Sequence, residues 1–435
     1  MSVFRILLVL LLAVGCGCRT NSFVGPPTPV TSPEETKTPA RPSAKTSFVK
    51  PPTLTSSQAD RVAIARSINA FAFDLYGKVL KPGENVFLSP YSTAVALSMV
   101  YAGARGETAN QMAKVLHFGR SREMVSVPLG DLNRVIVKTG RKSGAAMNLA
   151  NAVWVQKGLS LLKEYERLLL ESYGAGPKAV DFEGAPEASA REINEWAAKE
   201  TKGRITDIVR PDSVSQAGLI LANAIYFKAK WASQFDEKLT KPDDFTLLDG
   251  NKTRVEMMTQ AEDFGYFEGE DFQVLEMPYR GDELSMVIFL PRAHNGLPEF
   301  EKSLTFDKMI QYLELLGQQP VHVYIPRFTM RDSLKLGKSL KDLRMTDAFD
   351  LKKADFSGMT GRRDLFIDKV IQKTFVDVKE EGTEAAAVTA VTVVTGQPPS
   401  SPPVIPTFRA DHPFMFLIRH NKSGAILFMG RLVKP

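Results

Sequence analysis

Residues 380–403, EEGTEAAAVTAVTVVTGQPPSSPP, combine the composition of a β-strand with the boundaries of a loop. Every residue from Val388 to Thr395 except Ala390 is β-branched, which is typical of strands. The segment opens with small residues and closes in a run rich in proline, so no partner strand follows it directly. The chain must therefore fold in a way that holds a strand-forming segment outside a hairpin.

The first residues, MSVFRILLVLLLAVGC, predict a secretory signal peptide at 1–16. Arg5 precedes an apolar run at residues 6–14, which is shorter than the roughly 18 residues needed to span a bilayer. The ending Ala-Val-Gly-Cys resembles a bacterial lipoprotein signal, in which Cys16 becomes the lipidated first residue of the mature chain. Ala13 departs from that pattern, which prefers Leu there, and ordinary cleavage nearby is the alternative. We expect export, with a lipid anchor at the cell surface or in the periplasm, or secretion.

Both cysteines of the chain, Cys16 and Cys18, lie at this junction. The absence of later thiols excludes disulfides, thiolate catalysis and cysteine metal sites from a folded domain. Residues 17–59 are rich in Pro, Ser and Thr and are predicted to form a disordered tether. Residues 60–435 are then predicted to form one large domain, a monomer held together by its core.

The net charge of +6 is weak evidence for a nucleic-acid partner. The first 59 residues hold six Lys or Arg and two Glu, so most of the excess lies outside the predicted domain. Lys114, Arg120 and Arg122 could bind a polyanion, although a solvated helix end explains them as well. We predict no nucleic-acid partner.

Apolar spacing predicts more helices in the first half of the domain and more strands in the second. Residues 56–83 repeat apolar side chains at helical intervals, Ser89 and Pro90 can start a second helix, and residues 191–205 predict a third. Strand patterns occur at residues 147–158, 219–231, 274–292, 321–328, 370–381, 414–420 and 424–433. This order favours an α+β fold with a large, mostly antiparallel sheet covered by helices.

The sequence lacks the common motifs of hydrolases and nucleotide enzymes. It has no Gly-x-Ser-x-Gly elbow and no Gly-rich phosphate loop, and its five histidines show no metal-ligand spacing. Arg280-Gly281-Asp282 matches an adhesion tripeptide but lies between two strand patterns, where it is expected to form a hairpin turn. We predict no enzyme activity, no cofactor and no metal site.

Six segments match the motifs of one family in order and at family spacing. They are NVFLSPYSTAVALSMVYAGARGETANQM, INEWAAKETKGRI, LILANAIYFKAKW, VKEEGTEAAAVTAV, FRADHPFMFLIR and ILFMGRLVKP. By these segments the chain resembles the serpins, the serine protease inhibitor superfamily, over essentially the whole of residues 60–435. Ala229 departs from the pattern, because the family usually has glycine there.

The resemblance to serpins implies a fold and a mechanism. The implied fold has a five-stranded main sheet, smaller sheets, about eight to nine helices, and an exposed reactive-centre loop at about residues 380–408. In the implied mechanism a protease attacks the loop and becomes acylated, and the loop then inserts into the main sheet and deforms the protease. The uncleaved fold is expected to be metastable, and the expected partner is a target protease held in a covalent acyl complex.

The hinge of this loop suits insertion between two strands. It consists of Glu380, Glu381, Gly382, Thr383, Glu384, Ala385, Ala386 and Ala387. In an extended strand Thr383, Ala385 and Ala387 share one face, whereas Glu384 lies on the other and can stay in water. Serpins that do not inhibit typically carry bulky, charged or proline residues here. This hinge has only the family-typical glutamates, so inhibition is favoured over the alternative, a non-inhibitory surface lipoprotein.

Two ways of counting place the cleaved bond differently. Counting from Glu380 by family spacing gives Gly396–Gln397, with bonds at Thr395 and Val394 as near alternatives. Counting back from the segment ADHPF gives a bond nearer to Pro402, because this loop is about six residues longer than is usual in the family. The first count is preferred because it sets the length of the strand that inserts.

The composition of the loop narrows the target protease. From Glu380 to Phe408 there is no Lys or Arg, and no aromatic residue precedes Phe408. A trypsin-like pocket would keep its charge unpaired, and a chymotrypsin-like pocket would stay unfilled. An elastase-like or subtilisin-like serine protease is the predicted target, and a papain-like cysteine protease is the alternative.

The resemblance also assigns residues to the region where the strands of the main sheet part. Ser89, Ser92 and Asn223 fall in the middle of that region, and Trp231 falls at the top, where the loop first enters. Gln372 stands where the family commonly has a histidine. Because glutamine cannot titrate, a pH-sensitive gate at this position is not expected. For Trp231 and Asn223 an ordinary core role is the alternative.

Overall fold

The computed structural model describes the chain from residue 55 onward, with internal gaps. The described ranges are 55–119, 122–142, 146–215, 217–382 and 405–435. They belong to one compact unit, Pro51–Pro435. The predicted signal peptide with Cys16, and the predicted tether up to residue 54, lie outside the described residues.

The first helix begins slightly earlier than the predicted domain boundary at residue 60. Helix α1 (Gln58–Val79) starts directly after Ser57, whose hydroxyl accepts a hydrogen bond from the Asp60 backbone N–H. The Asp60 carboxylate accepts in return from the Ser57 backbone N–H, which completes a capping box. The helix therefore includes the last two residues of the predicted tether.

The described residues form eleven α-helices. After α1 these are α2 (Pro90–Tyr101), α3 (Gly106–Val115), α4 (Glu123–Lys142), α5 (Lys163–Tyr173), α6 (Pro186–Glu200), α7 (Pro211–Val214), α8 (Leu297–Ser303), α9 (Phe306–Glu314), α10 (Gly337–Asp342) and α11 (Ser357–Thr360). Ser89 caps α2 by accepting from Ser92 N–H, and Pro90 occupies its first turn, as predicted. None of the described helices has both the length and the apolarity needed to cross a bilayer.

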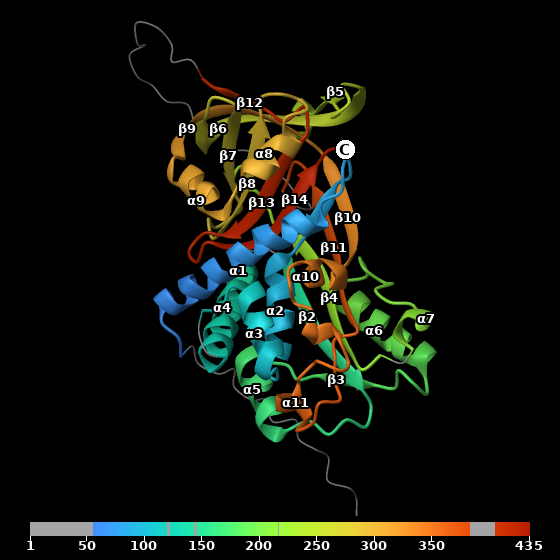
Figure 1. Cartoon of the computed structure of the whole chain (residues 1–435). Coiled ribbons are helices and arrows are strands. Elements are labelled where there is room, and N and C mark those ends of the chain that lie inside the picture. The colour runs from blue at the N-terminus through green and yellow to red at the C-terminus, as the bar shows by residue number, and fades with distance from the viewer. Residues whose placement is uncertain (1–54, 120–121, 143–145, 216, 383–404) are drawn as a thin grey trace, which may run out of the picture. The chain divides into compact units, whose positions relative to one another are not determined.

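The larger sheet has nine strands and is antiparallel except at one edge (Figure 1). Its path runs β1-β14-β13-β8-β7-β6-β9-β12, with β5 paired to β6. The strands are β1 (Val86–Leu88), β5 (Lys241–Thr246), β6 (Lys252–Glu268), β7 (Phe272–Pro278), β8 (Leu284–Pro291), β9 (Gly317–Pro326), β12 (Thr407–Arg409), β13 (Phe414–His420) and β14 (Ala425–Leu432). Gly281 and Asp282 lie in the turn between β7 and β8, both at positive φ, as expected for a hairpin.

The second sheet has five strands in the order β10-β11-β4-β2-β3. Its strands are β10 (Phe328–Lys335), β11 (Lys369–Val378), β4 (Leu219–Lys228), β2 (Ala146–Gln156) and β3 (Lys178–Val180). This sheet is mixed, because β11 runs parallel to β4 and β2 runs parallel to β3, while the other two pairs are antiparallel.

The predicted α+β class, with sheets covered by helices, is confirmed. The eleven described helices exceed the predicted eight to nine, because two of them, α7 and α11, are single turns of four residues. The implied five-stranded sheet is present, but it is mixed and not mostly antiparallel.

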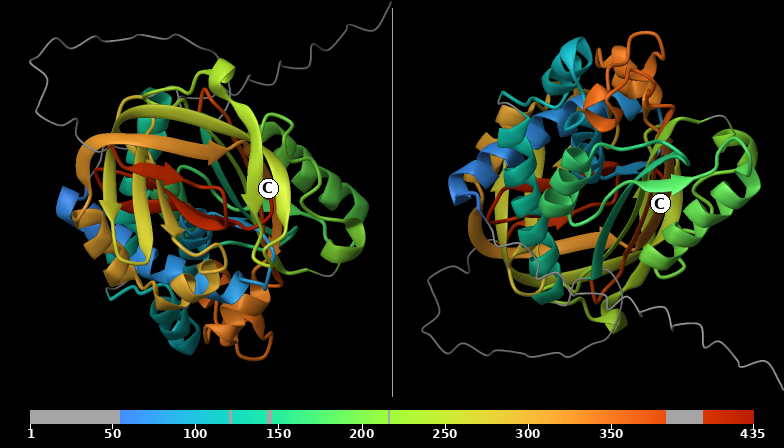
Figure 2. Two further views of the ribbon diagram at one scale, coloured as in Figure 1. Left: turned by 90° about the horizontal axis from the view of Figure 1, so that it is seen from above. Right: turned by 90° about the horizontal axis from the view of Figure 1, so that it is seen from below.

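Strand β4, in the middle of the five-stranded sheet, is buried on both faces, which explains its continuous apolar pattern. Ile220, Ala222 and Ala224 of β4 belong to a cluster completed by α6 and the chain that follows it. Leu221 and Ile225 point to the opposite face and join the main core. Figure 2 shows α6 on one side of this sheet and the blue helix α1 on the other side.

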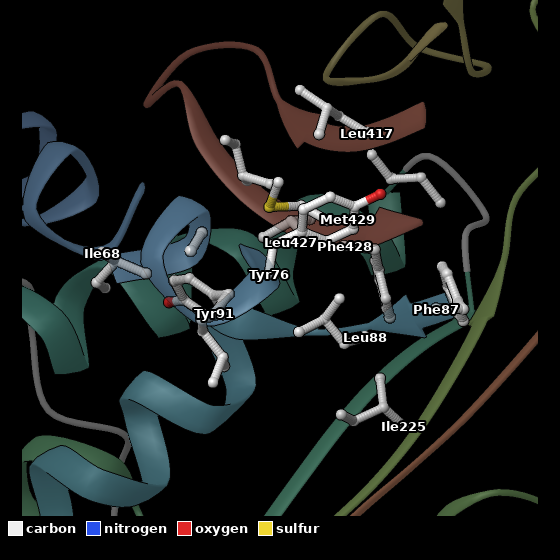
Figure 3. Packing of buried hydrophobic residues seen from close by; sticks show 14 of the residues in the cluster. Ile68, Tyr76, Phe87, Leu88, Tyr91, Ile225, Leu417, Leu427, Phe428 and Met429 are labelled. Carbon is white, nitrogen blue, oxygen red and sulfur yellow. The ribbon is translucent and has the colours of Figure 1, made fainter. Parts of the chain in front are cut away.

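The main core joins the two sheets through the short strand β1. Phe87 of β1 stacks on Phe428 of β14 with ring centroids 5.2 Å apart. Figure 3 shows Ile68 and Tyr76 of α1, Phe87 and Leu88 of β1, Ile225 of β4 and Phe428 of β14 in one packed cluster. The core therefore packs α1 against β14, and Phe428 of β14 in turn contacts Phe227 of β4 with ring centroids 5.4 Å apart.

A buried histidine at the end of β13 makes stability depend on pH. The His420 side chain is 1% exposed, and its Nδ1 lies 2.8 Å from the Ser423 hydroxyl. Burial lowers the pKa of His420 to about 4, well below the ordinary value of about 6.5. Between pH 6.5 and pH 4 the unfolded chain therefore binds a proton at His420 that the folded chain does not bind. The contribution of neutral His420 to the unfolding free energy is complete above pH 6.5 and is lost as the pH falls through 4.

We expect acidification from pH 7 to pH 4 to cost about 3 kcal/mol of unfolding free energy through His420 alone. Urea unfolding of the wild type and of His420→Gln at both pH values measures this share, because other titrating groups act equally on both proteins. The wild type should lose more stability than the variant on acidification. Equal losses in the two proteins would show that His420 does not cause the dependence.

Candidate functional site

The five-stranded sheet contains one central pair of parallel strands, which we call the seam. In the seam Lys369–Phe375 of β11 pairs with Ile220–Tyr226 of β4. The pairing stops at Phe375, although β11 continues to Val378 and β4 continues to Lys228. The two strands of the seam are therefore paired up to Phe375 and Tyr226. Beyond these residues, at the end where the chain leaves β11, they no longer pair with each other.

Gln372 fastens the middle of the seam to the start of α2. Its Oε1 accepts from Ser89 N–H at 2.8 Å, and its Nε2 donates to Ser89 O at 2.8 Å and to Thr93 Oγ1 at 2.9 Å. The Ser89 hydroxyl donates to Leu427 O of β14 at 2.7 Å. All of these side chains are buried, so the network ties β11 to α2 and β14 without contact with water.

A second polar cluster lies on the β4 side of the seam. Asn223 faces Gln372 across the seam and faces Asn151 across the β2–β4 pair. Asn223 Nδ2 donates to Asn151 Oδ1 at 2.7 Å, and the Ser92 hydroxyl donates to the same oxygen. The structure therefore brings Ser89, Ser92, Asn223 and Gln372 together around the middle of the seam.

We expect Gln372→Leu to lower the unfolding free energy by about 1–3 kcal/mol, because it removes the hydrogen-bond partner of the buried Ser89 N–H. The midpoint of urea unfolding measures the loss. Gln319→Leu is the matched control, since Gln319 is exposed on β9, and its midpoint should stay near that of the wild type. Unchanged unfolding of Gln372→Leu would contradict this account of the network.

The chain leaves β11 through a tight turn at Lys379–Gly382. Gly382 N–H donates to Lys379 O at 3.0 Å, and Lys379 N–H donates to Gly382 O at 2.9 Å. Gly382 also forms an antiparallel bridge with Lys230, just after β4. Gly382 therefore pairs in antiparallel fashion with Lys230, just after β4, and with Lys379, just after β11. It occupies the place that the first residue of a strand between β4 and β11 would take.

Only glycine fits at position 382. Its φ is +126°, and a Cβ atom there would lie 2.3 Å from Ala229 O and 2.6 Å from Lys230 Cα. These neighbours are backbone atoms and cannot move aside cheaply. The predicted preference for a small hinge residue is thus explained at Gly382 by direct backbone approach.

Glu380 anchors the same turn through buried contacts of its side chain and its carbonyl oxygen. Its side chain is 2% exposed, and its Oε1 accepts from Arg327 Nε at 2.6 Å and also from the Thr240 hydroxyl. Its carbonyl accepts from Phe235 N–H at 2.9 Å. A buried carboxylate with a charged partner is costly to separate, so Glu380 holds the start of the loop at the head of β11.

Trp231 lies directly against this turn. Its indole Nε1 donates to Lys379 O at 3.0 Å, and its backbone N–H donates to Glu381 O at 3.1 Å. The indole stacks on Tyr279 at a centroid distance of 4.5 Å. Trp231 is thus buried like a core residue and also contacts the start of the loop.

The two ends of the loop lie in different sheets. The chain leaves the five-stranded sheet at Gly382, and Thr407 begins β12 in the nine-stranded sheet. The predicted hinge residues Thr383, Glu384, Ala385, Ala386 and Ala387, and the predicted cleavage residues Val394, Thr395, Gly396 and Gln397, lie outside the described residues. Their roles stay predictions.

Several residues of the site were missed by sequence reasoning. Asn151 had a local signal, because Leu-Ala-Asn-Ala occurs at residues 149–152 and again at 221–224, and the two copies pair with Asn151 opposite Asn223. Arg327 had no local signal in the sequence, because it lies 53 residues before Glu380, the residue that it binds. Tyr279 and Thr240 likewise reach the site only through the tertiary fold.

The basic residues that, from the sequence, could bind a polyanion do not form a common site in the described part of the chain. Arg122 donates to the backbone oxygen of Ala104, Lys114 is exposed, and Arg120 is outside the described residues. Among the described His, Cys, Asp and Glu side chains, no group of three is placed to hold a metal ion.

The described site combines a parallel seam with a tight turn at the head of β11. Comparison with known proteins assigns the chain to a family. A family model described as "Serpin (serine protease inhibitor)" matches residues 66–435. The chain therefore belongs to the serpin family.

Individual relatives support this assignment over most of the chain. An uncharacterized serpin-like protein of Thermococcus kodakarensis is 40% identical over 86% of this chain and 86% of its own length. The leukocyte elastase inhibitor of Homo sapiens is 40% identical over 84% of this chain and 97% of its own. The crystal structure of the thermophilic serpin tengpin in the native state superposes with a TM-score of 0.76 at 28% identity, covering 86% and 94% of the two chains.

Proposed function

We propose that this serpin is a suicide-substrate inhibitor of an extracytoplasmic serine protease of the elastase-like or subtilisin-like kind. One observation carries the proposal: Gly382 lies antiparallel to the chain that follows β4 and to the chain that follows β11. A strand continuing from Gly382 between β4 and β11 would run antiparallel to both. It would replace one parallel ladder by two antiparallel ladders, which are slightly more stable per residue.

The chemical step uses the protease's own machinery. The protease serine Oγ attacks the carbonyl carbon of Gly396, the bond to the Gln397 nitrogen breaks, and the departing amine takes a proton from the protease histidine. An ester then joins the protease to Gly396. Insertion of the residues before Gly396 would carry the attached protease along the seam, over about 45 Å for some 14 extended residues. Hydrolysis of the ester is prevented if insertion deforms the protease first.

The target class rests on the loop and on one relative. The loop from Glu380 to Phe408 offers no basic residue to a trypsin-like pocket, whereas Val, Thr and Gly suit a shallow apolar pocket. The human relative at 40% identity is named as an inhibitor of leukocyte elastase. A papain-like cysteine protease is the competing target.

The setting is part of the proposal. The signal-like residues 1–16 support export, and Cys16 is the proposed site of lipidation, followed by a tether that holds a monomeric inhibitor away from the membrane. In the same proposal Glu380 to Ala387 form the hinge. Ser89, Ser92, Asn223, Gln372 and Trp231 control how the seam opens.

Incubation with elastase, subtilisin and papain tests the proposal. An inhibitor forms a complex with the protease that survives denaturing electrophoresis, and mass spectrometry of the released C-terminal peptide should find Gln397 at its start. Protease whose active-site serine has been blocked is the control and should give no complex. Cleavage without a complex would make the protein a substrate. If neither a complex nor cleavage is seen, the protein is a non-inhibitory member of the fold.

A further inference from the structure

A charged cavity of about 610 Å³ lies between two walls on the α6 side of the five-stranded sheet. One wall is the segment 207–213, which leads from α6 into α7 on the way to β4. The other wall is formed by the end of β10, by α10 and by the lower half of β11. Figure 1 shows α6 and α7 beside β11 and β4.

The lining of this cavity is strongly basic. Six basic and three acidic side chains line it. The basic side chains are Arg210, Lys335, Lys338, Lys341, Lys369 and Lys373, and the acidic ones are Asp207, Asp212 and Asp368. The lining therefore carries an excess of positive charge, in a domain whose charges are otherwise nearly balanced.

Only some of these cations are neutralised by neighbours. Lys369 pairs with Asp368, Lys373 pairs with Asp207 at 3.0 Å, and Lys338 pairs with Asp342 at 2.6 Å. Arg210, Lys335 and Lys341 form no ion pair with any carboxylate in the described part of the chain, and all three are exposed. They come from both walls of the cavity.

Beneath the charges the cavity has an apolar floor. Ile208 and Val209 from one wall, and Val370 and Ile371 from the other, line it with little exposed area. The Lys341 ammonium lies 5.3 Å from the centre of the half-buried Phe349 ring. A concave site with an apolar base and convergent charges is the usual form of a small-molecule site.

We infer that this cavity binds a compact polyanion whose closely spaced phosphate or sulfate groups contact Arg210, Lys335 and Lys341. Arginine and lysine are the usual partners of such groups, and three unpaired cations favour a ligand with several negative charges over a monoanion. The ligand would bridge the segment before β4 and the strands β10 and β11. Lys373 already bridges the same walls, since its Nζ donates to Asp207 O.

The bridging position predicts an effect on insertion, and this step rests on the proposed function. Insertion requires β11 to separate from β4, which would move the two walls of the cavity apart. A ligand that binds the closed cavity more tightly than the opened one shifts the equilibrium toward the closed form. Bound polyanion should therefore slow insertion.

Isothermal titration of the full chain with tripolyphosphate, sucrose octasulfate and inorganic phosphate tests the site. We expect one saturable site for at least one of the two polyanions and much weaker binding of phosphate. The tighter of the two polyanions identifies the natural source as a polyphosphate or a sulfated saccharide. Absence of saturable polyanion binding would overturn the inference.

Variants separate this cavity from general attraction to positive charge. Lys335→Gln with Lys341→Gln should weaken polyanion binding by about tenfold or more, because two charge-assisted contacts are lost. The control Lys163→Gln with Lys199→Gln removes two exposed lysines elsewhere and should bind as the wild type does. Equal weakening in both double variants would contradict the site. Arg210→Gln serves as a second test if the first double variant does not fold.

A separate measurement addresses the effect on insertion. The number of inhibitor molecules consumed per protease inactivated should rise when the polyanion is present, and this rise should disappear in the Lys335→Gln, Lys341→Gln variant. An unchanged number with saturated ligand would refute the coupling to insertion. If no protease forms a complex at all, the proposed function fails, while the titration still decides the site.

Discussion

Cleavage of the chain near Gly396 should raise the melting temperature of the domain by about 10 °C or more. In the described part of the chain β4 pairs directly with β11, and Gly382 lies between the chain extensions of these two strands. Cutting the loop releases the residues before Gly396 from β12, so they can enter the seam. About 14 residues of new ladder, at about 1 kcal/mol per hydrogen bond, amount to ~10 kcal/mol.

Calorimetry of intact and cleaved protein measures the rise. The matched control is a cut in the tether at residues 17–50, which also breaks the backbone but frees no strand for the seam. That cut should leave the melting temperature unchanged. If the loop-cleaved protein melts no higher than the intact protein, the uncleaved fold is not metastable, and this member of the serpin family would not inhibit by loop insertion.

Local signals in the sequence predicted the elements of this fold well. The start of α2 at Ser89 and Pro90 and the hairpin at Gly281-Asp282 depend on neighbouring residues only, so their chemistry can be read from the sequence. The strand pattern at residues 219–231 was equally clear, because β4 is buried on both faces.

The pairing of these elements could not be predicted in the same way. β4 and β11 are far apart in the sequence, and no periodicity states that they are parallel neighbours. The resemblance placed Gln372 in the opening region, but only the register shows that it faces Asn223 and binds Ser89. The Glu380–Arg327 pair is a tertiary contact of the same kind.

The geometry at Gly382 adds physical content to the hinge prediction. Backbone atoms of Ala229 and Lys230 surround the α-carbon so closely that no side chain can be accommodated. From its composition alone, the hinge is predicted to need small side chains so that it can insert between two strands. The structure gives the reason at this position: the gap between the two seam extensions is already filled by backbone.

Thr383→Arg should convert the inhibitor into a substrate. Thr383 follows Gly382 and shares a face with Ala385 and Ala387 in an extended strand, so insertion would bury the arginine. Burial of an unpaired charge costs far more than 1.4 kcal/mol, and each 1.4 kcal/mol slows insertion about tenfold. The ester should then be hydrolysed before insertion, and the fraction of protease trapped should fall by about tenfold or more.

Glu384→Arg is the matched control, because residue 384 lies on the opposite face of the inserted strand and can stay in water. This variant introduces the same side chain one residue further along and should trap most of the protease. Titration of protease activity, with electrophoresis of the products, measures both variants. Loss of trapping in both would mean that the loop rejects arginine before insertion. Full trapping by Thr383→Arg would show that position 383 does not enter the seam, because no burial cost would have been paid there.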